Sequence, residues 1–350
     1  MPEEALSQPG KPGSPSGNTA RMLDAEAAGP DPVGSRLGRL AEIRAFSPGS
    51  ISEAAHRRRR RQSLLGETGR LVIIAADHPA RGALGAGRDP MAMADRAELL
   101  ERLVLALSRP GVDGLLGTPD VVEDLLMLGA LDEKVVIGSM NRGGQAGAVF
   151  EMDDRVTAYS PKSIQAGNLD GGKMLLRIDG EDPGSLATLQ ACAAAIDDLA
   201  ERGLMAMLEP FVSFRVKGRV RNDLRPDSVA RSLAVASGLG GTSCHTWLKV
   251  PVVEDMQRVM RSSSLPALLL GGEVTDEPTE VFRTWERALR LPTVFGVVAG
   301  RSLLYPADGN VQGAVDEVVE MVDRSAGRMD VDMSMLPIEG AGSGMEDVGG

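Results

Sequence analysis

The sequence contains few of the residues that build metal sites, disulfide frameworks and aromatic cores. Only 3% of its 350 residues are aromatic, and it has two cysteines and three histidines. Cys192 and Cys244 form no CxxC pair, and the histidines form no HxH or HExxH motif. These absences argue against a disulfide-rich domain and a zinc site, and they fit a reducing, cytoplasmic setting. We therefore expect an aliphatic core, no metal and no other cofactor.

Long apolar runs and an excess of basic charge are also missing. No stretch approaches the roughly 18 consecutive apolar residues of a transmembrane helix. The polar N-terminal residues lack the apolar segment of a secretory signal. The net charge of −11 argues against general nucleic-acid binding. We expect a cytoplasmic protein without membrane or nucleic-acid partners, and a homo-oligomer whose size the sequence does not specify.

Composition divides the chain into two polar tails, a short helical stretch and a long patterned region. Residues 1–32 and 326–350 have no hydrophobic periodicity and are predicted to be disordered. Residues 33–69 are predicted to form a helical extension. Its apolar residues recur at helical spacing, at Leu37, Leu40, Ile43 and Phe46.

Five consecutive arginines, Arg57 to Arg61, lie within this extension. Such a run can form a patch for anions or nucleic acids. More often it belongs to a solvated helix face, which is the interpretation that we favour.

Between residues 70 and 325, short apolar runs alternate with helical stretches. The eight runs are Leu71–Ala76, Val112–Gly117, Lys134–Ser139, Lys173–Asp179, Leu204–Glu209, His245–Val250, Leu265–Gly271 and Thr293–Gly300. Strands that alternate with helices predict parallel pairing with right-handed crossovers. Eight such units in about 255 residues match the size of a (β/α)8 TIM barrel. The competing open sheet usually carries a GxGxxG turn after its first strand, and this chain has none there.

One lysine inside an apolar run requires an explanation. The chain has six lysines against 32 arginines, yet Lys249 lies between Leu248 and Val250. Burial penalises an ammonium and favours the neutral amine, which can form a Schiff base with a carbonyl substrate. The alternative is a lysine at a strand edge that extends to solvent. We hypothesise that Lys249 is a nucleophile.

Polar residues concentrate at the C-terminal ends of the predicted strands, where (β/α)8 barrels carry their chemistry. They are Asp77, His78, Asn141, Arg142, Arg177, Asp179, Glu209, Lys249, Gly271, Gly272, Gly300 and Arg301. Glu209 is suited to proton transfer beside a nucleophilic lysine, although a loop carboxylate is the alternative. Lys173 could lower the pKa of a neighbouring amine or could lie exposed at the strand start.

The remaining polar residues suggest substrate contacts. Asp77 could orient hydroxyl groups or hold a lysine, and Arg177 with Asp179 could form a structural ion pair. Backbone N–H groups in the loops after the seventh and eighth strands often bind phosphate. The candidates for phosphate and substrate binding are Gly271, Gly272, Gly300, Arg301, His78 and Arg142. Glu273 would repel a phosphate unless its side chain points away.

At these residues the chain resembles the class I tagatose-1,6-bisphosphate aldolases and the related sulfofructose-phosphate aldolases, over about residues 70–305. The matching stretches are Ala75-Ala76-Asp77, Arg81-Gly82-Ala83-Leu84, Lys173-Met-Leu-Leu-Arg-Ile-Asp179, Leu208-Glu209, Leu248-Lys249-Val250 and Val298-Ala299-Gly300-Arg301-Ser302. Each motif is short, but together they occur in the family's order and at comparable spacing.

The resemblance implies a role for each matching residue. Lys249 matches the Schiff-base lysine, Glu209 the acid/base carboxylate and Lys173 a second catalytic lysine. Asp77 matches an aspartate of the pocket, and Arg301 an arginine that contacts phosphate. The family has Gln where this chain has His78, and the seventh-strand motif also differs, so the resemblance supports the reaction more than the substrate.

Together the residues and the resemblance predict a metal-independent class I aldolase that cleaves a ketose phosphate, with dihydroxyacetone phosphate as the expected ketone product. The chain resembles an actinobacterial group linked to inositol catabolism, so a ketose phosphate from that route is one candidate substrate. A deoxyribose-phosphate type of aldolase, a metal-dependent lyase and a catalytically silent barrel that binds a sugar phosphate remain as alternatives.

Overall fold

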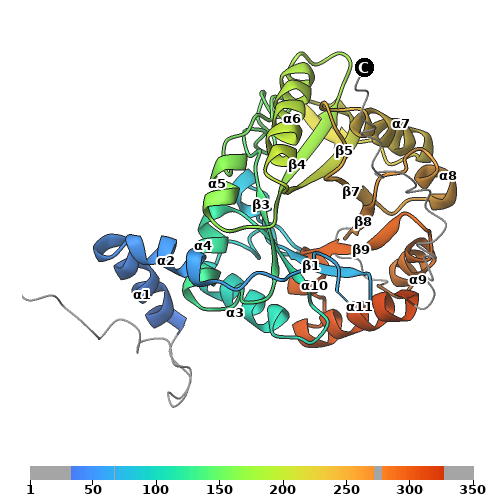
Figure 1. Cartoon of the computed structure of the whole chain (residues 1–350). Coiled ribbons are helices and arrows are strands. Elements are labelled where there is room, and N and C mark those ends of the chain that lie inside the picture. The colour runs from blue at the N-terminus through green and yellow to red at the C-terminus, as the bar shows by residue number, and fades with distance from the viewer. Residues whose placement is uncertain (1–32, 67, 272–277, 327–350) are drawn as a thin grey trace, which may run out of the picture.

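All eight predicted apolar runs form strands, and these strands pair in parallel to close a barrel (Figure 1). The computed structural model describes residues 33–66, 68–271 and 278–326. The strands are β1 (Leu71–Ala75), β2 (Gly114–Gly117), β3 (Val135–Ser139), β4 (Gly171–Ile178), β5 (Met205–Val216), β7 (Thr246–Pro251), β8 (Ala267–Leu270) and β9 (Val294–Ala299). Their order is β4-β3-β2-β1-β9-β8-β7-β5, and the pairing of β4 with β5 closes the circle. The predicted (β/α)8 barrel is confirmed.

Helices surround the barrel and connect its strands (Figure 1). They are α3 (Arg96–Leu107), α4 (Pro119–Met127), α5 (Pro161–Ala166), α6 (Gly184–Glu201), α7 (Pro226–Ser237), α8 (Met256–Met260), α9 (Pro278–Leu289), α10 (Arg301–Leu304) and α11 (Val311–Ala326), with a short 3₁₀ helix, η1 (Pro79–Arg81). The side chain of Asp95 caps α3 by accepting hydrogen bonds from the backbone N–H groups of Ala97 and Glu98. None of the described helices is long and apolar enough to cross a membrane.

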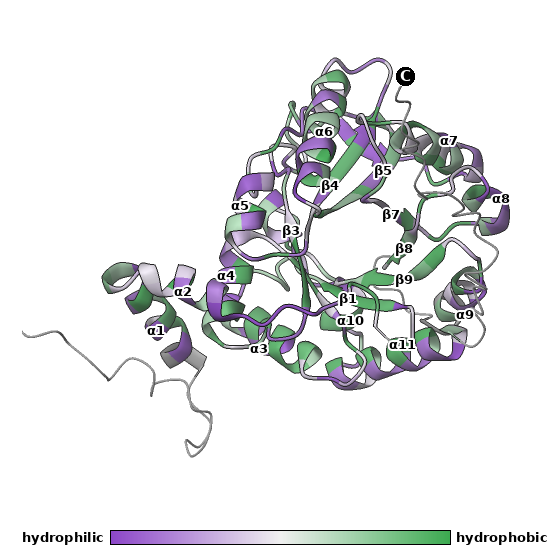
Figure 2. Ribbon diagram, viewed as in Figure 1, coloured by the Kyte–Doolittle hydropathy of each residue, from purple (hydrophilic) through white to green (hydrophobic). Residues whose placement is uncertain are grey.

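The barrel has two apolar layers because successive side chains of a strand point to opposite faces. In β1, Leu71 and Ile73 face the lumen, whereas Val72 and Ile74 pack against the surrounding helices. Figure 2 shows the strands as mainly hydrophobic, with hydrophilic residues on the outer sides of the helices. Because of this alternation, the lumen-facing positions that follow the aliphatic layer lie at the C-terminal end of the barrel. These positions hold polar side chains.

β5 is longer than the sequence pattern indicated. The basic stretch that follows Glu209 is a hairpin, in which β5 pairs antiparallel with β6 (Arg219–Asn222). Lys217 and Gly218 form its turn with positive φ angles of 49° and 79°. A two-residue turn with both φ angles positive matches the right-handed twist of a hairpin, so this segment is not an irregular loop.

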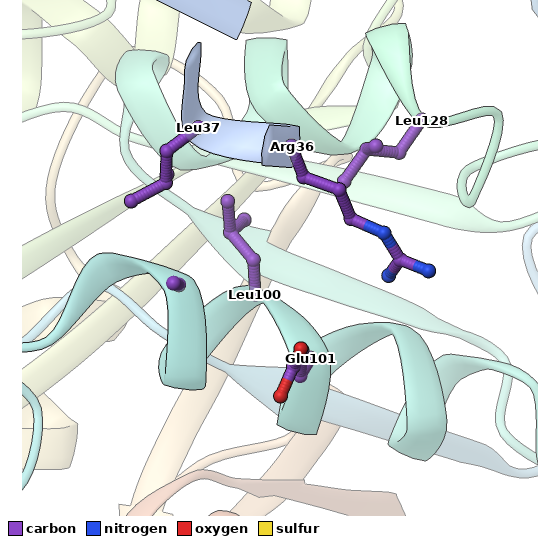
Figure 3. Close-up of a pocket in the computed structure, with 6 residues that line it drawn as sticks. Arg36, Leu37, Leu100, Glu101 and Leu128 are labelled. Atoms are coloured by element: carbon purple, nitrogen blue, oxygen red, sulfur yellow. The ribbon is translucent and has the colours of Figure 1, made fainter. Parts of the chain in front are cut away.

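The N-terminal extension contains two helices, α1 (Val33–Phe46) and α2 (Gly49–Arg57), which lie beside α3 and α4 (Figure 1). Leu37 of α1 lies near Leu100 of α3, next to a cavity of about 10 Å³ (Figure 3). This volume is roughly that needed by one water molecule, so the cavity is a packing gap. Phe46 is 84% exposed and does not continue the packed stripe. The expected disorder of residues 1–32 and of the C-terminal tail concerns residues outside those described.

Arg58 to Arg61 join the extension to the N-terminal end of the barrel, whereas the side chain of Arg57, at the end of α2, is mainly exposed, as predicted for a solvated helix face. The Arg58 side chain is 1% exposed, contacts Asp170 at 3.2 Å and donates a hydrogen bond to the carbonyl of Lys134. The other contacts join Arg59 to Asp132, Arg60 to Asp170 and Arg61 to Asp113. We call Arg58 to Arg61 the arginine clasp.

The arginine clasp pairs with carboxylates that also accept backbone hydrogen bonds near the starts of two strands. Asp113 accepts a hydrogen bond from the backbone N–H of Val72, and Asp170 accepts one from Val136. Arginine pairs with carboxylates in a planar, bidentate geometry that lysine cannot reproduce. The clasp is therefore part of the structure of the barrel.

Replacing Arg58 with methionine is expected to lower the free energy of unfolding by about 3 kcal/mol, because it leaves buried polar groups without their cation. Urea unfolding followed by circular dichroism measures this change. Arg57→Met is the matched control, since Arg57 contacts only the exposed Glu53 among the described residues. Equal losses of stability in the two variants would contradict the role of the clasp.

Candidate active site

Five charged side chains meet inside the C-terminal end of the barrel and alternate in sign. In spatial order they are Arg142, Asp77, Lys173, Glu209 and Lys249, and we call this set the charged row. Each is at most 9% exposed. Buried charges of this kind are stable only when opposite charges lie beside them, and the alternation supplies those partners.

The two lysines share one carboxylate. Lys249 Nζ lies 3.0 Å from Glu209 Oε1, and Lys173 Nζ contacts the other oxygen, Oε2, at hydrogen-bond distance. The strand register explains the first contact, because Leu208 of β5 is paired with Leu248 of β7 and the residue after each faces the lumen. The structure thus brings together the three residues that the sequence predicted as nucleophile, acid/base carboxylate and second lysine.

Lys173 lies near the start of β4 but does not point to solvent, so the alternative of an exposed lysine is wrong. It is paired in register with Ser139 of β3, and it is 3% exposed. Its side chain extends along the lumen, and Nζ reaches Asp77 Oδ2 at 3.3 Å. A long side chain near the base of the site can thus contact carboxylates from two other strands.

Asp77 is held by two residues of the β3 end. Ser139 Oγ donates a hydrogen bond to Asp77 Oδ2 at 3.1 Å, and Arg142 Nη1 donates one to the Asp77 carbonyl at 2.7 Å. Arg142 Nη2 contacts the carboxylate as well. Arg142 was predicted to bind substrate, but the structure engages its guanidinium with Asp77. Ser139 was not predicted as a site residue, although its place as the last lumen-facing residue of the third run is a usable signal.

The charges fix the protonation of the carboxylates. Burial alone would raise the pKa of Glu209, but the charges of Lys173 and Lys249 outweigh burial and lower that pKa to about 2. Burial likewise opposes ionisation of Asp77, and Arg142 and Lys173 hold its pKa well below the usual value. Burial lowers the pKa of Lys173 despite its two carboxylate neighbours. Both carboxylates are therefore ionised at neutral pH.

Because of Glu209, we expect the free energy of unfolding of the protein to depend on pH in the acid range. Its pKa is about 2 in the fold against an ordinary value of 4.5, so its stabilising contribution is complete above pH 4.5 and is lost as the pH falls towards 2. We expect the unfolding free energy to fall more steeply over this window in the native protein than in Glu209→Gln. Urea unfolding at several pH values measures both slopes, and equal slopes would contradict the assignment.

The ends of β8 and β9 border the same lumen. A Cβ atom on Gly300 would lie 2.3 Å from the carbonyl oxygen of Ala75, so only glycine fits at this position, where the end of β9 lies against the end of β1. Arg301 follows it and donates a long hydrogen bond, 3.5 Å, to the carbonyl of Gly85. Gly271 packs against β9. The proposed contacts of Gly272 and Glu273 fall outside the described residues.

His78 lies at the edge of the charged row. Its Nδ1 is 3.9 Å from Asp77 Oδ1, and burial lowers its pKa to about 4. The imidazole is therefore neutral at pH 7 and adds no charge to the lumen.

A second group of buried ion pairs lies close to the charged row. Arg177 contacts Glu151 at 2.6 Å, so the suggested pairing of Arg177 with Asp179 is wrong. Arg81 contacts Asp154 at 2.5 Å. Each pair balances its own charge and anchors the loop that follows β3. The sequence could not reveal these pairs, because their members are separated by long stretches of chain.

Asn141, at the end of β3, has a structural role in the same loop. Its side-chain amide donates hydrogen bonds to the carbonyls of Asp154 and Leu175. Its side-chain oxygen accepts one from the backbone N–H of Leu175. Asn141 thus ties the loop after β3 to β4.

Comparison with known proteins places the chain in a family. The Cgl0159-like family matches residues 69–319, and the chain belongs to this family. The crystal structure of Cgl0159 from Corynebacterium glutamicum is 52% identical, with a TM-score of 0.80, and the match covers 83% of this chain and 97% of that one. No curated protein matches the chain.

More distant solved structures share the fold. A Schiff base forming fructose-1,6-bisphosphate aldolase matches with a TM-score of 0.55 and 16% identity, over 78% of this chain and 99% of that one. An archaeal fructose-1,6-bisphosphate aldolase, whose catalytic lysine is covalently bound to a carbinolamine intermediate, matches with a TM-score of 0.56 and the same identity and coverage. The barrel of this chain is thus similar to the barrels of class I aldolases.

Proposed function

We propose that the protein is a class I aldolase that cleaves a ketose phosphate through a Schiff base on Lys249. The observation that carries this proposal is the bridge in which Glu209 contacts both Lys249 and Lys173 inside the lumen. A site that only binds a sugar phosphate has no need for a nucleophile beside a proton-transfer group. The shared fold with aldolases that act through a lysine supports the proposal.

Schiff-base formation begins with one proton transfer. Glu209 takes a proton from Lys249 when that amine carries one, and the neutral amine adds to the ketone of the substrate. The carbinolamine oxygen is then protonated by Glu209 and leaves as water, which produces an iminium. A carboxylate with a pKa of about 2 must first accept a proton in order to act as an acid, and Lys249 lies close enough to supply it.

Carbon–carbon cleavage uses the iminium as an electron sink. The bond between the third and fourth carbons breaks, its electron pair forms an enamine, and Glu209 accepts the proton of the fourth-carbon hydroxyl. Lys173 stabilises the developing charge on that oxygen. The aldehyde leaves, the enamine is reprotonated, and water releases the ketone product, which we propose to be dihydroxyacetone phosphate.

We place the substrate phosphate at the ends of β8 and β9. Arg301 offers a guanidinium fork, and Gly271 and Gly300 allow close approach of the backbone. His78 borders the same region. The tagatose and sulfofructose phosphate aldolases resembled in sequence, and a ketose phosphate of inositol catabolism, define the substrates to test first. Deoxyribose phosphate, cleaved by another lysine-dependent type of aldolase, belongs in the same screen.

A cleavage assay tests the proposal. The protein is incubated with a panel of ketose phosphates and with deoxyribose phosphate, in the presence of EDTA, and the products are separated by mass spectrometry. We expect one panel member to yield dihydroxyacetone phosphate and an aldehyde, and borohydride added with that substrate to inactivate the protein. Activity that EDTA abolishes would support a metal-dependent lyase instead.

A further inference from the structure

The charged row carries one more positive charge than negative charge when all its members are ionised. Arg142, Lys173 and Lys249 are the cations, and Asp77 and Glu209 are the anions. All five are buried. A surplus charge in a buried site is costly, because protein groups screen it far less than water does.

Among residues 33–66, 68–271 and 278–326, the groups around the row do not cancel this surplus. Close to the row, Arg81 pairs with Asp154 and Arg177 pairs with Glu151, so these four charges balance. His78 at the edge is neutral at pH 7. Arg301, on the β9 side, is a further cation near the lumen. The surroundings therefore add to the positive charge of the row until an anionic substrate binds.

Within the charged row, a lysine is the only group that can remove the surplus. The arginine guanidinium keeps its proton in proteins, and both carboxylates are already ionised. Loss of one proton from Lys173 or Lys249 makes the row neutral. Because Glu209 contacts both amines, the remaining proton can move between the two lysines.

We propose that Arg142 is a positioning residue whose fixed charge, held against Asp77, expels one proton from the Lys173–Lys249 pair and so supplies the neutral amine. Arg142 is suited to this task because it contacts the Asp77 carboxylate and carbonyl together and cannot titrate away. The use of that amine in a Schiff base rests on the proposed function, whereas the charge balance does not.

Lysine NMR tests the charge balance without any substrate. The chain has only six lysines, so their ¹³Cε signals can be followed against pH and assigned with Lys173→Met and Lys249→Met. We expect the midpoint of the lumen lysine titration to rise by about 1 to 2 pH units in Arg142→Met, because a neighbouring cation is lost. Asp77→Asn raises the surplus to two charges and is expected to shift the midpoint in the opposite direction.

Arg177→Met is the matched control. It removes another buried arginine, but one that contacts Glu151 and, in the described part of the chain, no member of the charged row. We expect it to lower stability and leave the midpoint in place. An Arg142→Met protein that is folded with an unchanged midpoint would overturn the proposal. If that variant does not fold, a midpoint in Asp77→Asn that is unchanged or higher would overturn it.

Borohydride trapping with dihydroxyacetone phosphate across the pH range tests whether the charge of Arg142 also affects Schiff-base formation. We expect adduct formation in Arg142→Met to be slower below the new midpoint, by roughly tenfold for each pH unit that the midpoint has risen, and to recover at higher pH. A loss that is equal at every pH would indicate a purely structural role. Absence of an adduct in the native protein would refute the proposed function, and the NMR titration would still decide the role of Arg142.

Discussion

Replacing Lys249 with methionine is expected to abolish ketose phosphate cleavage and to leave the barrel folded. Methionine keeps an unbranched side chain in the lumen, and Glu209 retains Lys173 as its cationic partner. Because the proposed iminium forms on Lys249, turnover should fall on the order of 10⁴-fold or more. Initial rates measure the loss, and circular dichroism with a thermal melt checks the fold.

Lys162→Met is the control for this variant, because Lys162 is exposed on α5, away from the lumen. It should retain native turnover. Appreciable cleavage by Lys249→Met would show that the reaction does not pass through this amine. A Lys249→Met protein that fails to fold would be replaced by Lys249→Arg, which keeps a cation beside Glu209 and still cannot form the iminium.

Replacing Glu209 with glutamine is expected to give the second largest effect. Glutamine keeps the shape and can accept a hydrogen bond, but it cannot carry a proton between the lysine, the carbinolamine and the substrate hydroxyl. Turnover should fall by about 10² to 10⁴-fold, the usual contribution of general acid–base catalysis. The amine remains, so borohydride should still trap an adduct on Lys249, although more slowly.

The combination of adduct and lost turnover is the diagnostic result for Glu209. A purely structural carboxylate would affect both measurements through stability alone. Glu101→Gln, which changes an exposed carboxylate on α3, serves as the control and should match the native protein. Native turnover in Glu209→Gln would remove Glu209 from the mechanism.

The sequence predicted the barrel well because its strands are buried on both faces. Such strands appear as short continuous apolar runs, and all eight runs became strands. The central site residues were also accessible, because a lysine or carboxylate at the end of an apolar run departs from the local pattern. Lys249 and Glu209 were found in this way, whereas Lys173 begins its run and became a candidate mainly through the family resemblance.

The arginine clasp and the charge balance of the row could not be predicted, because both depend on long-range contacts. Arg58 contacts Asp170, which is more than a hundred positions away along the chain. Arg142 was noticed as a strand-end residue, but nothing local indicates that it pairs with Asp77. The β5–β6 hairpin was not predicted for a different reason, since its many cations obscure the alternating apolar residues.

The most direct measurement is to trap dihydroxyacetone phosphate on the native protein with sodium borohydride and to locate the adduct by peptide mass spectrometry. We expect one stable adduct, on Lys249, which is absent from Lys249→Met. An adduct on Lys173 in its place, or no adduct from any ketose phosphate that the protein cleaves, would show that Lys249 is not the nucleophile.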